Sequence, residues 1–165
     1  MKTTLTKNFL MIFALMAFSV GVKAQMNIEI TGVGQSLFPV AVMRFVGENQ
    51  LPVKVTDVVR SNLTRSGAIR NVESGSAELG WDINPDYKSW SARGADALAV
   101  GNVTKLSDGR FEIRYRLFDI RKGESLGGLV VTVGVEDLRL AGHKIADDII
   151  QRTVEPCKRA LEDAK

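Results

Sequence analysis

Three strand-like stretches, two of which alternate apolar and polar residues, are separated by short glycine-containing turns and constrain the fold of this chain most strongly. In the clearest stretch, residues 111–118, every second position is apolar (Phe111, Ile113, Tyr115 and Leu117). Residues 107–110 and 121–124 have turn compositions, and they separate this stretch from a largely apolar strand-like stretch at 97–104 and from a second alternating one at 129–135. Strict alternation predicts strands with one buried face, and such short turns join antiparallel neighbours. We therefore expect a three-stranded meander.

Helical spacing occurs before and after this meander. In residues 53–66, an apolar face is formed by Val55, Val58 or Val59, and Leu63. In residues 136–151, one stripe contains Leu138, Ala141, Ile145 and Ile149. Both patterns are typical of helices that pack on a core, and residues 85–93 predict a third, shorter helix.

Two further extended stretches complete the predicted sheet. Residues 40–46 are mostly apolar and predict a central strand, and residues 26–30 alternate like a half-buried strand. The order of elements predicts an α+β fold of two layers, a mixed five-stranded sheet with helices packed on one face. We expect this domain to span 37–151, with a flexible arm at 25–36 before it and a polar tail at 152–165 after it.

The first 24 residues have the layout of a secretory signal peptide. Lys2 and Lys7 precede an almost wholly apolar run from Phe9 to Val20, and small residues follow up to Ala24. The run is too short for a comfortable membrane span, so we expect cleavage after Ala24 and a periplasmic product. The alternative is an uncleaved anchor. A lipid-anchored form is not expected, because no cysteine lies near the predicted cleavage site.

Removal of this segment changes the charge of the protein. The full chain has 22 basic and 19 acidic residues, and the segment contains three of the bases (Lys2, Lys7 and Lys23) and no acid. The remaining chain is therefore neutral, with 19 of each. A neutral domain gives no electrostatic reason to expect nucleic-acid binding or stable membrane insertion. The single cysteine, Cys157, excludes an intrachain disulfide.

No constellation of side chains in the sequence indicates catalysis. His143 is the only histidine, which excludes a multi-histidine metal site, and we expect it to have a packing or surface role. The segment Gly32-Val33-Gly34 lacks the context of a phosphate loop. Carboxylates are numerous, but their spacing selects no pair. We therefore predict a protein that is not an enzyme and has no cofactor or metal, with a small envelope hydrolase that uses an unrecognised carboxylate pair as the alternative.

The predicted arm offers main-chain chemistry instead. Ile28 and Ile30 alternate with Asn27 and Glu29, and a glycine-rich stretch follows. An extended arm with unpaired N–H and C=O groups can add a strand to the sheet edge of another protein. The arm could equally pair within its own domain.

Several segments, in order, resemble the amino-terminal domain of the TolB family, the periplasmic component of the Tol–Pal envelope system. They are Val40-Ala41-Val42-Met43-Arg44-Phe45, Val58 to Gly67, Trp90 with Gly94 to Gly101, and Ala141 to Asp147. The resemblance covers roughly residues 26 to 151. It implies an α/β domain with a mixed sheet, helices on one side, and an amino-terminal arm associated with binding the carboxy-terminal domain of TolA. The implied partner-binding residues are Gln25, Met26, Asn27, Ile28, Glu29 and Ile30.

Two departures from the family limit what is carried over. In the family the domain precedes a β-propeller that binds the lipoprotein Pal, and nothing after Gln151 resembles that propeller, so Pal binding is not expected. Arg44 stands where the family usually has proline. We predict an interaction module in envelope integrity, cell division and macromolecule import that docks a TolA-like partner through its arm. A non-functional truncated TolB is a further alternative.

Overall fold

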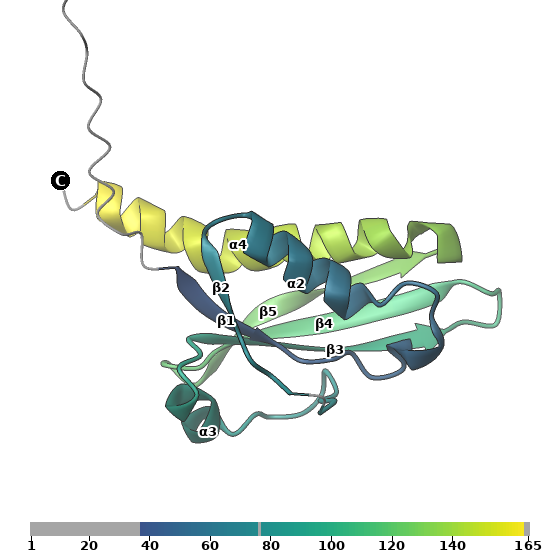
Figure 1. Cartoon of the computed structure of the whole chain (residues 1–165), viewed down its shortest axis with the longest axis horizontal. Coiled ribbons are helices and arrows are strands. Elements are labelled where there is room, and N and C mark those ends of the chain that lie inside the picture. Colours follow the sequence, from purple (N-terminus) through teal and green to yellow (C-terminus); the bar gives the residue numbers. More distant parts are fainter. Residues whose placement is uncertain (1–36, 76, 164–165) are drawn as a thin grey trace, which may run out of the picture. The chain divides into compact units, whose positions relative to one another are not determined.

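The computed structural model describes residues 37–75 and 77–163, except for the side chains of 157–162. Within these residues the chain forms one five-stranded sheet with the strand order β2-β1-β3-β4-β5 (Figure 1). The strands are β1 (Phe38–Val42), β2 (Ile69–Val72), β3 (Ala97–Lys105), β4 (Phe111–Asp119) and β5 (Glu124–Val133). β1 is parallel to β2 and β3, whereas β3, β4 and β5 are successively antiparallel. The predicted fold class, a mixed five-stranded α+β sheet, is confirmed.

The predicted meander is β3–β4–β5. Gly109 and Gly123, in its two turns, have left-handed φ angles of +86° and +71°, which only glycine adopts without strain. β5 begins at Glu124 rather than at residue 129. A β-bulge opposite Leu117 and Phe118, where Gly127 has a φ of +93°, interrupts the pairing of β5 with β4. The first half of β5 therefore shows no alternation of apolar and polar residues.

β2 is a strand that the sequence pattern did not predict. Only its end residues, Ile69 and Val72, are buried, and the two between them are exposed, so it shows neither alternation nor an apolar run. It pairs with β1 in parallel register and forms one edge of the sheet. The strand expected at residues 26–30 lies outside the described residues.

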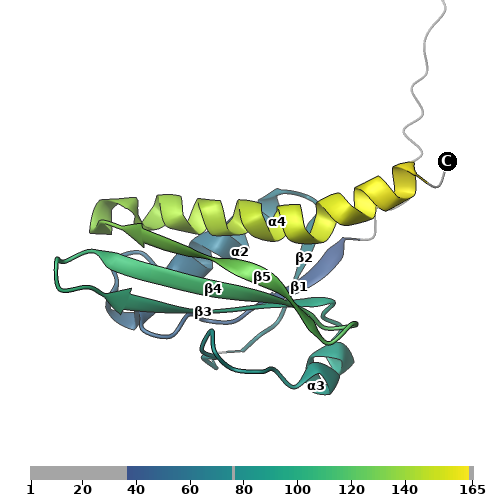
Figure 2. The same cartoon turned by 180° about the vertical axis from the view of Figure 1, so that it is seen from behind.

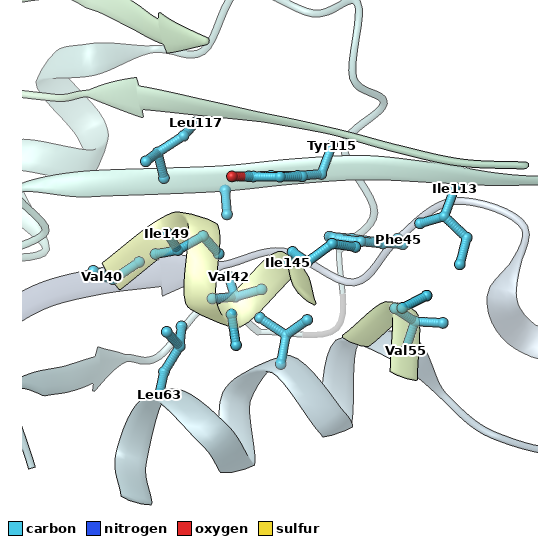
Figure 3. Packing of buried hydrophobic residues seen from close by; sticks show 14 of the residues in the cluster. Val40, Val42, Phe45, Val55, Leu63, Ile113, Tyr115, Leu117, Ile145 and Ile149 are labelled. Atoms are coloured by element: carbon cyan, nitrogen blue, oxygen red, sulfur yellow. The ribbon is translucent and has the colours of Figure 1, made fainter. Parts of the chain in front are cut away.

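Two helices, α2 (Val55–Arg65) and α4 (Leu138–Glu162), cover one face of the sheet (Figures 1 and 2). All four residues of the predicted α4 stripe are fully buried: Leu138, Ala141, Ile145 and Ile149. Figure 3 shows two of them, Ile145 and Ile149, between the alternating side chains of β4 and the apolar face of α2. The predicted helical layer is therefore confirmed on this face.

The prediction that this last helix ends near Gln151 is wrong, because α4 continues through Pro156 to Glu162. Thr153 and Val154 are only 3% and 8% exposed, so the helix still packs on the core beyond the predicted end. Pro156 removes one main-chain hydrogen bond without ending the helix. Despite the length of α4, no helix among the described residues is both long and apolar enough to cross a membrane.

The short helix α3 (Tyr87–Ala92) lies against the other face of the sheet, which adds a second, smaller core to the predicted arrangement. The side chain of Asp86 accepts hydrogen bonds from the first-turn amides of Lys88 and Ser89, which starts the helix. Trp90 then packs with buried side chains of the central strands, namely Ala41, Met43, Leu98, Val100 and Phe118. β1 and β3 are thus buried on both faces.

The two large helices approach each other closely at Gly142. A Cβ atom there would lie 2.7 Å from Cγ1 of Val58 on α2, so only glycine fits this contact. Alongside, Asn62 Nδ2 lies 2.6 Å from His143 Nδ1. His143 is half-buried at this seam between the helices, in the packing role expected from the sequence.

A buried acid holds the start of α2. Glu48, in the short 3-10 helix η1 (Glu48–Gln50), is 1% exposed, and its Oε2 accepts a hydrogen bond of 2.9 Å from the Thr56 amide. Thr56 Oγ1 in turn accepts one of 3.0 Å from the Phe45 amide. Burial raises the pKa of Glu48 above its ordinary value of 4.5, although the hydrogen bond from Thr56 opposes this shift.

We predict that replacing Glu48 by glutamine makes the stability of the fold less dependent on pH. Because the pKa is higher in the folded chain, the contribution of this carboxyl is complete below pH 4.5 and is lost as the pH rises through the folded pKa. Glutamine keeps an acceptor for Thr56 and does not ionise. Urea unfolding at about pH 4 and about pH 7 should show the free energy of unfolding of the variant rising relative to the wild type. A constant difference would contradict a raised pKa.

Candidate docking surface

The two edge strands of the sheet differ in what they offer to a partner. β2 has four residues, and the side chain of its Asn71 is engaged with α2, where Nδ2 donates to Arg60 O at 3.0 Å and to Thr64 Oγ1 at 2.6 Å. β5 has ten residues and lies at the opposite edge (Figure 2). Short edge strands are poor templates for pairing, so β5 is the better candidate.

The first half of the β5 edge is covered by a side chain from α4. Arg152 donates from Nη1 to the carbonyl of Leu126 at 2.9 Å and from Nη2 to that of Gly128 at 3.5 Å. Its Nε donates to Asp148 Oδ2 at 2.7 Å. This hydrogen bond to Asp148 raises the pKa of Arg152, so the guanidinium stays charged. Arg152 therefore satisfies outward-facing carbonyls that would otherwise be open to solvent or to another strand.

The same carboxylate connects α4 to the centre of the sheet. Asp148 Oδ2 also accepts a hydrogen bond from the hydroxyl of Tyr115 on β4, whose ring is buried in the main core. Burial, reinforced by Asp148, raises the pKa of Tyr115 strongly, so this phenol remains protonated in the folded chain. Tyr115, Asp148 and Arg152 thus form one network across β4, α4 and β5.

The second half of the β5 edge is open. Alternate residues of a strand direct their main-chain groups to the same side, so Val130 and Thr132 face the same way as Gly128. No described residue makes a hydrogen bond with their main-chain groups across this edge. The Val130 side chain is 56% exposed, and the segment 129–133 contains no charged residue. Open main-chain groups beside uncharged β-branched side chains favour the addition of another strand.

The structure does not place the six residues that the sequence predicts for partner binding. Gln25, Met26, Asn27, Ile28, Glu29 and Ile30 all lie outside the described residues. The open edge of β5 was not among the predicted sites, because it depends on the position of Arg152, which is 24 residues away from Gly128 in the sequence. Only the uncharged run 129–133 could have indicated it.

The acids that the hydrolase alternative would need are distributed between separate places. Glu48 is buried at the start of α2, and Asp148 is held by Tyr115 and Arg152 where α4 packs on β4 and β5. In the part of the chain that the structure describes, no group of three or more histidine, cysteine, aspartate or glutamate residues could hold a metal ion.

Comparisons with known proteins agree with this fold. The sequence profile of the TolB amino-terminal domain matches residues 26–126. The Tol-Pal system protein TolB of Albidiferax ferrireducens is 41% identical over 131 residues, which are 79% of this chain and 31% of that protein. The corresponding protein of Polaromonas sp. (strain JS666) is 42% identical over 129 residues, which are 78% of this chain and 30% of that protein.

A solved structure gives the same result. The crystal structure of TolB from Acinetobacter baumannii aligns with a TM-score of 0.58 and 26% sequence identity, over 70% of this chain and 28% of that one. This chain therefore spans about a third of the length of the relatives that it matches, and the match falls on their amino-terminal domain.

Proposed function

The chain belongs to the TolB amino-terminal domain family, and from this we propose that it is a protein-interaction module of the Tol–Pal system in the periplasm. It docks a TolA-like partner by main-chain pairing, for which it has two elements. In this proposal residues 25–30, the predicted arm, pair as a strand with the partner, and the open half of β5 accepts a strand from it. The observation that carries this proposal is the uncovered edge at Val130 and Thr132, beside carbonyls that Arg152 already satisfies.

Main-chain pairing at this edge gives affinity without reactive side chains. A strand of the partner that aligns with residues 129–133 hydrogen-bonds with the outward-facing groups of Val130 and Thr132. Each such bond contributes about 1 kcal/mol net, so a short pairing gives a weak, reversible contact. The exposed Val130 side chain adds apolar contact on one face of the new strand.

The contribution of the arm is tested by deleting residues 25–30 and measuring retention of a TolA-like periplasmic domain in a pull-down. The deletion leaves every residue of the described fold in place, so the circular dichroism spectrum and the melting temperature should not change. We expect retention to be lost. Unchanged retention would rule out docking through the arm.

The contribution of the edge is tested by replacing Thr132 with proline. The outward N–H of Thr132 is not used by β4, so proline removes one docking donor and blocks close approach of a strand, yet it leaves the internal ladder intact. We predict a fold of near wild-type stability and a partner affinity reduced about tenfold. Val131→Pro is the matched control, because it breaks the ladder to β4 and should destabilise the domain itself. Wild-type affinity of a folded Thr132→Pro variant would exclude the β5 edge.

A further inference from the structure

We infer that the groove between α2 and α4 is a second recognition site, which binds an acidic peptide segment of a protein partner. The groove has a volume of about 390 Å³ and lies on the outer side of the helical layer. Its walls come from one side of α2 along its whole length, with the turn before it, and from the first turns of α4. None of these residues belongs to the β5 edge or to the arm, so this inference goes beyond the proposed function and is independent of it.

The ionised side chains of the groove are predominantly basic. Arg65, Arg139 and Lys54 line it, against a single carboxylate, that of Asp57. Lys54 is already engaged, because its Nζ donates to the main-chain carbonyls of Glu48, Asn49 and Leu51. Arg139, in contrast, has no hydrogen bond or ion pair with any residue that the structure describes. A free guanidinium in a groove is a ready partner for a carboxylate, which it binds through two parallel hydrogen bonds.

A hydrogen-bond chain orients the remaining donors. Arg65 Nη2 donates to Asn62 Oδ1 at 3.1 Å, so the oxygen of this amide faces Arg65. The amide nitrogen, Nδ2, therefore faces His143 and lies 2.6 Å from its Nδ1. Because Nδ1 accepts from Asn62, the network assigns the proton of the neutral imidazole to Nε2. His143 therefore carries one unused N–H donor, and Arg65 is held beside it by the Asn62 side chain.

The non-ionised part of the groove indicates a peptide rather than a sugar or a nucleotide. Pro52, Val53 and Val58 form an aliphatic wall, and no phenylalanine, tyrosine or tryptophan lines the groove. Sugars and bases are usually held by stacking on the rings of phenylalanine, tyrosine or tryptophan, which this groove lacks. Aliphatic contacts next to guanidinium groups suit a segment in which aspartate or glutamate alternates with apolar residues.

The test uses the purified protein and a pair of synthetic peptides, acetyl-Ala-Glu-Leu-Glu-Ala-amide and its glutamine counterpart, acetyl-Ala-Gln-Leu-Gln-Ala-amide. Binding is followed by changes in the amide chemical shifts of Asn62, Arg65, Arg139 and His143 in a two-dimensional ¹H–¹⁵N spectrum. We expect saturable shifts at these residues with the glutamate peptide, about tenfold weaker binding of the glutamine peptide, and loss of binding as salt is added.

The double variant R65E/R139E should weaken binding of the glutamate peptide by at least about tenfold. R121E/K122E is the matched control, because it makes the same change in net charge with exposed residues that do not line this groove, and it should bind like the wild type. Equal binding of both peptides, equal effects of both double variants, shifts confined to other residues, or no binding of the glutamate peptide would each overturn the inference. The pull-down with the arm deletion is unaffected by any of these outcomes, so the two proposals fail separately.

Discussion

Replacing Gly101 with alanine is expected to lower the free energy of unfolding by about 2–3 kcal/mol, because it forces an added atom into a filled core. The new Cβ would lie 2.7 Å from the carbonyl oxygen of Arg114 and 3.0 Å from two carbons of the Phe45 ring. The first neighbour is main chain of β4 that is fixed in the ladder with β3, and the second is a fully buried side chain. Neither can move without disturbing strand pairing or core packing. Urea unfolding followed by tryptophan fluorescence measures the loss.

Gly134→Ala is the matched control for this substitution. Gly134 also has a short Cβ contact, but only with the carboxylate of Glu136, which is the free end of an exposed side chain. We expect a change of less than about 0.5 kcal/mol there. Adding Gly101→Ala to a Phe45→Leu variant should lower the free energy of unfolding by less than adding it to the wild type. The smaller leucine side chain relieves the contact with the ring. Equal effects at Gly101 and Gly134 would contradict the close packing of β3 against Phe45.

Replacing Asp148 with alanine is expected to have the second large effect, a loss of about 3 kcal/mol. The carboxylate accepts hydrogen bonds from the buried hydroxyl of Tyr115 and from Arg152. Its removal leaves both donors without this acceptor. Arg152 also loses the contact that fixes its guanidinium over the β5 carbonyls. We therefore expect faster hydrogen exchange along the edge of β5, in addition to lower stability in urea unfolding.

The neighbouring acid provides the control for this prediction. Asp147→Ala removes the same charge from the exposed side of the same helix and should change the stability by less than about 0.5 kcal/mol. Tyr115→Phe, which removes only one donor, should cost about 1 kcal/mol. If Asp148→Ala were no worse than Asp147→Ala, the network would have no structural role.

The spacing of apolar residues was sufficient to predict the helices and strands that have one buried face. β4, the second half of β5, α2 and the stripe of α4 show regular spacing because each packs one side on the core, and Gly109 and Gly123 have positive φ angles in the two predicted turns. β2 was missed because its middle residues are exposed and its pairing with β1 is decided by a neighbour 31 residues away. The end of α4 was misplaced because Pro156 is a helix breaker by local preference, yet core contacts at Thr153 and Val154 hold the helix together.

The candidate sites were harder to predict than the fold. The arm was identified from its alternation and from family resemblance, and it remains a prediction. Apart from the uncharged run 129–133, neither the open edge nor the groove has a local signature, since each is created by packing between distant segments. Arg152 reaches back to Leu126, and Asn62 meets His143, which is 81 residues further along the chain. Such contacts depend on the register between α4 and the rest of the domain, which a single sequence does not reveal.

The packing of α4 against α2 has a consequence for how the polypeptide acquires its structure. α4 fills the helical side of the main core, and its partners on β1 and α2 lie some eighty or more positions earlier. The contacts that close the helical side of the main core are therefore of high sequence separation, and loops of this length close slowly. Whenever the chain emerges amino terminus first, from a ribosome or across a membrane, the domain stays incomplete until the final helix arrives. Until then the strands expose apolar surface that a chaperone can hold.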